Sequence, residues 1–123
     1  MPEFPEESLA AVRARLQAGM IGFLEDDEGD DDEARDAPYT RADIDECMRI
    51  VDTYLAAVRS SPVAGLMPLV RDTVLRLNVL NDRCEGVLIE TDQREDLCHI
   101  LLVAARSAGM TEQGDVTEQW REW

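Results

Sequence analysis

The sequence contains no lysine, a single histidine and only three cysteines among its 123 residues. All 12 basic residues are therefore arginines, and they form no cluster, so direct binding to nucleic acid is not expected. Cys47, Cys84 and Cys98 show no Cys-x-x-Cys spacing, and each lies beside or within an apolar helical pattern. We expect all three to be reduced core residues, and we expect no metal or cofactor.

Long apolar runs are also missing. No stretch approaches the roughly 20 apolar residues that a membrane-spanning helix needs. The N-terminal residues MPEFPEES have neither a basic region nor an apolar run, so they do not resemble a signal peptide. These absences predict a cytoplasmic protein without membrane association. A length of 123 residues predicts one domain, residues 1–123, with a core of its own.

Acidic residues are abundant, and their distribution is uneven. The net charge is −15, and residues 25–37 alone carry nine acids and one arginine, a net of −8. This segment has no large apolar residue and its charges repel, so it predicts a disordered linker. An alternative role is a flexible arm that attracts a basic partner. A calcium-binding EF-hand does not fit, because placing Gly29 at the sixth position puts Leu24 at the first ligand position.

The spacing of apolar residues predicts an all-α bundle. Four main helices are expected near residues 9–21, 41–59, 68–84 and 93–108, with a short C-terminal helix after them. Thr40 and Asp43 form a capping box at the start of the second helix. The third helix is expected to begin at Pro68, after a short turn over residues 62–66, because proline is unfavourable inside a helix. Residues 87–89 are expected to seal one end of the core.

The helix near 93–108 is predicted to lie at the centre of the core. Every residue from Leu97 to Ala105 is apolar except His99, and a helix that is apolar almost all round is a buried helix. Asp92 and Glu95 have the spacing of a capping box, and Gly109 supplies the residue that ends the helix. In the tail, Asp115 and Glu118 predict one more capping box. Trp120 and Trp123 follow it and either dock on the bundle or remain available to a partner.

The sequence contains few of the residue patterns that catalysis or metal binding requires. Asp96 and His99 have the spacing of one metal-binding unit of a di-iron bundle, but that architecture needs a second such unit. Asp43 with Glu46, and Asp92 with Glu95, match the acidic pairs of helical nucleotide pyrophosphohydrolases only in outline. Both pairs lie in first helical turns, where acids favour the positive end of the helix dipole. We predict no catalytic residue, and the chain contains no glycine-rich phosphate loop.

In size and charge the chain resembles the small acidic helical immunity proteins that neutralise basic nucleases or toxins. We therefore predict an interaction protein that binds a basic protein partner and neutralises or regulates it, with a metal-dependent hydrolase of phosphate substrates as the alternative. No pattern predicts an oligomeric state. The acidic arm is expected to speed association, and the tryptophans to provide an apolar anchor. The predicted partner-binding residues are Glu25, Asp26, Asp27, Glu28, Asp30, Asp31, Asp32, Glu33, Glu90, Asp92, Glu95, Trp120 and Trp123.

Overall fold

The computed structural model describes residues 8–28 and 39–123, and within these ranges the chain is helical and contains no strand. The predicted all-α fold with four main helices is confirmed. Two short 3₁₀ helices, η1 and η2, complete the structure. The elements in chain order are α1 (Leu9–Glu28), α2 (Arg41–Arg59), η1 (Val63–Gly65), α3 (Leu66–Arg83), α4 (Thr91–Ser107) and η2 (Val116–Gln119).

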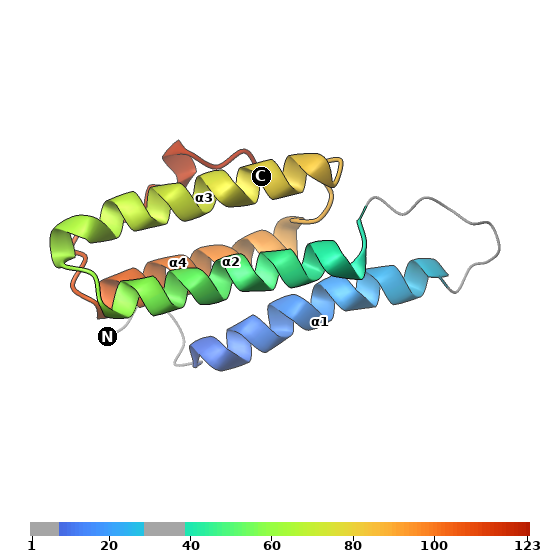
Figure 1. The fold of residues 1–123 in the computed structure, drawn as a ribbon, viewed down its shortest axis with the longest axis horizontal. Coiled ribbons are helices and arrows are strands. Elements are labelled where there is room, and N and C mark those ends of the chain that lie inside the picture. The colour runs from blue at the N-terminus through green and yellow to red at the C-terminus, as the bar shows by residue number, and fades with distance from the viewer. Residues whose placement is uncertain (1–7, 29–38) are drawn as a thin grey trace.

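The four main helices form an up-and-down bundle in which each helix runs antiparallel to the next (Figure 1). α1 packs mainly against α4, and α2 packs mainly against α3. α4 contacts all three other main helices, as its apolar sequence predicts, and α2 does so as well. The central position is therefore shared by two helices.

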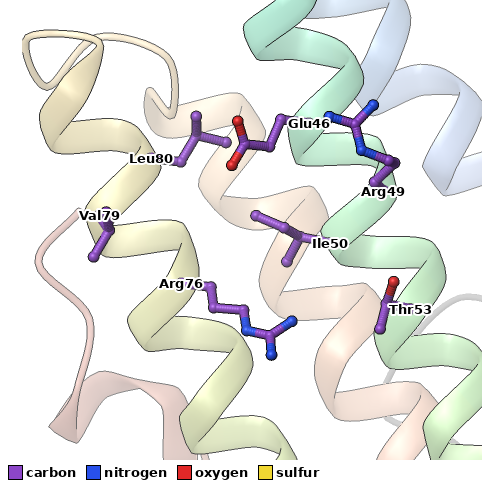
Figure 2. Close-up of a pocket in the computed structure, with 7 residues that line it drawn as sticks. All are labelled: Glu46, Arg49, Ile50, Thr53, Arg76, Val79 and Leu80. Carbon is purple, nitrogen blue, oxygen red and sulfur yellow. The ribbon is translucent and has the colours of Figure 1, made fainter.

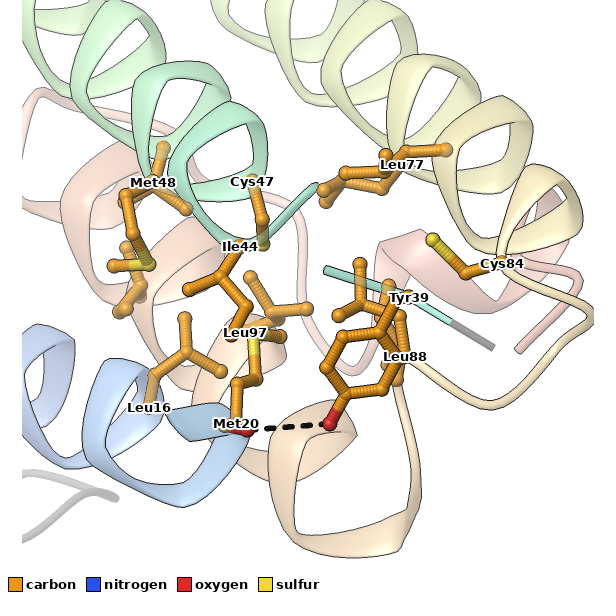
Figure 3. Packing of buried hydrophobic residues seen from close by; sticks show 14 of the residues in the cluster. Leu16, Met20, Tyr39, Ile44, Cys47, Met48, Leu77, Cys84, Leu88 and Leu97 are labelled. Carbon is orange, nitrogen blue, oxygen red and sulfur yellow. Dashed lines mark hydrogen bonds between the residues drawn. The ribbon is translucent and has the colours of Figure 1, made fainter. Parts of the chain in front are cut away.

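The core consists of buried side chains from all four helices (Figure 3). The third helix contributes five residues at helical spacing, all of them buried: Val70, Val74, Leu77, Leu80 and Cys84, its C-terminal cap. Tyr54 on α2 is also buried, and its hydroxyl donates to the Leu101 carbonyl at 2.6 Å. Burying one large aliphatic side chain contributes about 1.5–3 kcal/mol, so these residues dominate the stability of the bundle.

α1 is longer than expected. It was predicted to end near residue 21, but it continues through Gly22 to Glu28, inside the acidic segment. A glycine inside a helix costs only about 1 kcal/mol, and Leu24, which packs against the core beyond Gly22, offsets that cost. Residues 25–28 of the predicted linker therefore form the last turn of α1. Residues 29–37, the rest of the predicted linker, lie outside the described residues.

Two helices begin earlier than predicted. α3 starts at Leu66, which places Pro68 in its first turn. Proline fits there because the first N–H groups of a helix have no acceptor within the helix. α4 starts at Thr91, so Glu90 rather than Asp92 is the capping residue. The Glu90 N–H donates to Gln93 Oε1 at 3.2 Å, and this contact replaces the predicted Asp92–Glu95 capping box.

The predicted ends and connections are mostly confirmed. Thr40 and Asp43 form the expected capping box at the start of α2. Gly109 has φ +117°, and beyond it the Met110 N–H donates to the Ala105 carbonyl at 3.0 Å, which ends α4. The stretch 87–89 does cover the core, because the Ile89 N–H donates to a buried side chain, Asn81, at 2.9 Å.

The C-terminal segment forms a 3₁₀ turn rather than an α-helix. The Asp115 carboxylate accepts a hydrogen bond from the Thr117 N–H at 3.0 Å. The predicted capping box with Glu118 is therefore wrong, because Asp115 caps a residue only two positions away. Trp120 and Trp123 are half-buried against the core, so both dock on the bundle.

All three cysteines are free thiols. Cys47 and Cys84 are buried in the core, as predicted, and Cys98 is half-buried, with its Sγ 3.5 Å from Thr117 Oγ1. Burial raises the pKa of Cys47 to about 12 and that of Cys84 to about 11. These thiols therefore remain protonated and unreactive at neutral pH. None of the helices in the described ranges has the length and apolar character to cross a bilayer.

Candidate functional site

A hollow of about 440 Å³ lies between the second half of α1 and the start of α4. The turn before α4 and Tyr39, two residues before α2, complete its wall. We call it the acidic–aromatic hollow, and its lining residues are Gly19, Gly22, Phe23, Tyr39, Val87, Leu88, Glu90, Thr91, Asp92 and Gln93. It joins residues that are far apart in the sequence, and its volume is within the range of protein binding sites.

Two stacked aromatic rings form one wall of the hollow. The rings of Phe23 and Tyr39 are 5.4 Å apart between centroids and inclined by 23°. Tyr39 is buried, and its hydroxyl donates to the Met20 carbonyl at 3.2 Å (Figure 3). Phe23 is 40% exposed, so solvent reaches part of its ring. An aromatic ring held in this way has an electron-rich face that attracts cations.

Two exposed acids from α4 form another wall. Glu90 caps the helix and Asp92 lies in its first turn. Burial is the main cause that raises the pKa of Tyr39 to about 12, and the negative charge of Glu90 adds to it. Glu90 is therefore close enough to act electrostatically on the aromatic wall. A cation in the hollow would meet both a carboxylate and an aromatic face.

The absence of a side chain at Gly19 brings α1 close to α4. A Cβ atom at Gly19 would lie 3.0 Å from Gln93 Nε2, which is tighter than ordinary contact. The glycine therefore allows the helix approach that forms the floor of the hollow. At Gly22 an added Cβ would meet nothing within 4 Å, so this side of the hollow is open.

The predicted partner-binding acids fall into three places. Glu90 and Asp92 line the acidic–aromatic hollow. Glu95 instead lines a separate cavity of about 330 Å³ with His99 and Asp115. Residues 25–28 form the last turn of α1, immediately after Phe23 and Leu24, and residues 30–33 lie outside the described residues.

The tryptophans are not part of the hollow. Asn78 on α3 binds the tail at two points, because its Nδ2 donates to the Trp120 carbonyl at 2.8 Å and its Oδ1 accepts from the Glu122 N–H at 3.0 Å. The Arg121 guanidinium lies 5.4 Å from the centre of the Trp123 ring. Neither tryptophan lines the hollow or the cavity beside His99.

The acidic pairs considered for catalysis are engaged elsewhere. Arg83 binds Glu46 at 2.7 Å and lies 3.5 Å from Asp43, so one pair is neutralised by an arginine. Asp96, the neighbour of His99 in the sequence pattern, binds Arg15 of α1 at 2.7 Å. Among residues 8–28 and 39–123, no three His, Cys, Asp or Glu side chains are grouped to hold a metal ion.

No protein-family model, curated protein or solved structure matches the chain. The candidate site is therefore chosen from the geometry of the described residues alone. The features that remain are the exposed acids, the partly exposed ring of Phe23 and the start of the acidic run beside it. The sequence analysis did not assign Phe23 and Tyr39 to a site. A signal was present in the position of Phe23, which lies near the end of the apolar residues of α1 and two residues before the acidic run.

Proposed function

We propose that this protein is a small acidic interaction protein that binds a basic protein partner and neutralises or regulates it, as immunity and inhibitor proteins do. The observation that supports this proposal is the acidic–aromatic hollow. Phe23, Glu90 and Asp92 lie around one open space, and the run of acids from Glu25 to Glu33 begins two residues after Phe23.

An arginine or lysine side chain of the partner has the chemistry that this hollow favours. Its charged end lies over the exposed part of the Phe23 ring, a contact that contributes about 0.5–1 kcal/mol at an exposed site. Glu90 and Asp92 supply carboxylates to the same cation. Both acids are exposed, so their carboxylates are hydrated and available to the cation in the free protein. The hollow thus provides a specific contact within a broader negative field.

The acidic run acts earlier, during approach. Eight acids in the nine positions from Glu25 to Glu33 produce a negative potential that speeds encounter with a positive partner and weakens as salt rises. We assign encounter to this run and retention to the hollow. The free thiols in apolar surroundings support a cytoplasmic location, where cysteines remain reduced.

The test compares matched baits in a native extract, with captured proteins identified by mass spectrometry. The unaltered chain is expected to retain a basic protein that the triple variant Phe23→Ala, Glu90→Gln, Asp92→Asn does not retain. A control variant, Glu112→Gln with Glu118→Gln, removes the same charge from exposed acids outside the hollow and is expected to retain it. Equal retention by all three baits, or capture of acidic proteins only, would refute the proposal.

Kinetics with the purified partner then separate the two roles. Changing Asp30, Asp31 and Asp32 to Asn is expected to slow association and to flatten its dependence on salt. The Phe23→Ala change is expected mainly to speed dissociation. If neutralising the acids left association at low salt unchanged, the acidic run would have no role in encounter.

A further inference from the structure

A second surface lies on α2 and α3, which contribute no residue to the acidic–aromatic hollow. It is a groove of about 430 Å³ between the two helices (Figure 2). We call it the α2–α3 groove, and its lining residues are Glu46, Arg49, Ile50, Thr53, Arg76, Val79 and Leu80. Ile50 from α2 and Arg76 from α3 point toward one another across it (Figure 2).

The groove has an exposed apolar edge. Val79 is 64% exposed, and Leu75, one helical turn before it on α3, is 43% exposed. Single exposed apolar residues are normal on protein surfaces. Here Val79 lines the groove together with Ile50 and Leu80, so its exposed apolar side chain is continuous with the floor of the groove. Such continuity is typical of interaction surfaces.

The charge of the groove is opposite to that of the protein. The chain has 27 acids and 12 arginines, and acids engage many of the arginines, as in the pairs Arg13–Asp52 and Arg83–Glu46, both at 2.7 Å. Arg49 and Arg76 are exposed and form no ion pair with any residue that the structure describes. The one acid of the groove, Glu46, is held by Arg83. Two uncompensated cations therefore flank an apolar floor.

We propose that the α2–α3 groove binds an amphipathic acidic helix of a partner protein. Two antiparallel helices form a channel that a third helix can enter with its apolar face down, which is a common mode of peptide recognition. The apolar face of the incoming helix covers Ile50 and Val79, and acids on its flanks meet Arg49 and Arg76. A nucleic acid satisfies the arginines but leaves the apolar edge exposed to water, so the geometry favours a protein helix.

This inference does not depend on the proposed function, because the groove and the hollow have no lining residue in common. If both proposals hold, the protein can bind a basic partner and an acidic one at the same time. It would then bring together two proteins of opposite charge.

The test uses a labelled synthetic helix with the length of α3, 18 residues, that carries leucines on one face and glutamates on both flanks. Binding to the unaltered protein is measured by fluorescence anisotropy. The change Arg76→Glu is expected to weaken binding about tenfold or more, as loss of a central interface arginine does. Arg41→Glu, which reverses an exposed arginine at the start of α2 outside the groove, is expected to leave binding within about twofold.

Apolar contact is tested with a second matched pair. Val79→Ser is expected to weaken binding several-fold, whereas Val63→Ser, at a residue that is 57% exposed and outside the groove, is expected to leave it unchanged. A peptide with lysines in place of the glutamates is expected not to bind the groove. Circular dichroism of each variant confirms that the bundle is intact.

Three results would overturn the proposal. The first is no binding of the acidic peptide at concentrations up to about 1 mM, or binding that Arg76→Glu and Val79→Ser do not change. The second is a single-stranded oligonucleotide that binds more tightly than the peptide and depends on Arg76. The third is a dimer, seen by analytical ultracentrifugation, that Val79→Ser dissociates and the peptide does not, because a second copy of the chain would then occupy the groove.

Discussion

Replacing Tyr54 with phenylalanine removes one hydroxyl from the centre of the bundle and tests how the helices are joined. Tyr54 is 2% exposed, and its hydroxyl donates to the Leu101 carbonyl at 2.6 Å, which links α2 to α4. Burial also raises the pKa of Tyr54 well above the usual value for tyrosine, so the hydroxyl remains a donor at neutral pH. Tyr54→Phe keeps the ring and its apolar contacts.

The expected cost follows from what remains after the change. Because Leu101 lies inside α4, its carbonyl still accepts the ordinary helical hydrogen bond. The variant therefore loses one net hydrogen bond without leaving the carbonyl without a donor. A typical net value is about 0.5–1.5 kcal/mol, and a short buried bond belongs at the upper end. We expect the free energy of unfolding to fall by about 1–1.5 kcal/mol, with a drop in Tm of about 3–5 °C.

A matched control is available in Tyr39, which is also buried and donates to a helix carbonyl, that of Met20, at 3.2 Å. The longer bond predicts a smaller cost for Tyr39→Phe, about 0.5 kcal/mol. Urea unfolding followed by far-ultraviolet circular dichroism measures both variants, and the dependence on urea concentration should keep its slope. If Tyr54→Phe cost no more than Tyr39→Phe, or stabilised the protein, the reasoning from bond length and burial would be wrong.

Two further predictions concern glycines and alkaline pH. Gly22→Ala is expected to stabilise the protein by about 0.5–1 kcal/mol, because the position is helical and the added Cβ meets nothing within 4 Å. Gly109→Ala is expected to destabilise it by about 1–2 kcal/mol, because φ is +117° and the Cβ would lie 2.9 Å from Val63 Cγ2. Thermal unfolding measures the change in Tm of both variants, and equal changes would contradict this prediction. Burial raises the pKa of Cys47, Cys84 and Tyr39 to about 12, 11 and 12 in the folded protein, so their contribution to stability is complete below about pH 9 and is lost as the pH rises toward 12. Urea midpoints measured at several pH values from about 8 to 11 should fall steadily, and a constant midpoint would show that these groups titrate normally.

The sequence predicted the start of a helix well where capping residues mark that start. α2 begins at the predicted residue because Thr40 and Asp43 satisfy each other and the first N–H groups of the helix. α4 begins earlier than predicted because Glu90, capped by Gln93, takes the place expected for Asp92. α1 is longer than predicted because the packing of Leu24 on the core offsets the cost of Gly22 within the helix.

The site was less predictable, because it depends on distances between segments. The acids Glu90 and Asp92 were predicted, since exposed acids at a helix start are visible in the sequence. Their proximity to Phe23 was not predicted, because it arises from the packing of α1 on α4, which residue spacing within one helix does not give. The arginines of the α2–α3 groove were missed for a related reason. Whether an arginine is paired depends on which helix lies opposite, and the sequence does not contain that information locally.

The attachment of the tail through Asn78 has a consequence for spectroscopy. Both tryptophans of the chain lie within its last four residues, and one side chain on α3 makes two of the hydrogen bonds that hold this segment. Tryptophan emission therefore reports the docking of the tail, while far-ultraviolet circular dichroism reports the four helices. If the tail undocks at lower denaturant than the bundle unfolds, the two signals will give different midpoints. That discrepancy would measure a local opening, and its size would give the free energy with which the tail is held.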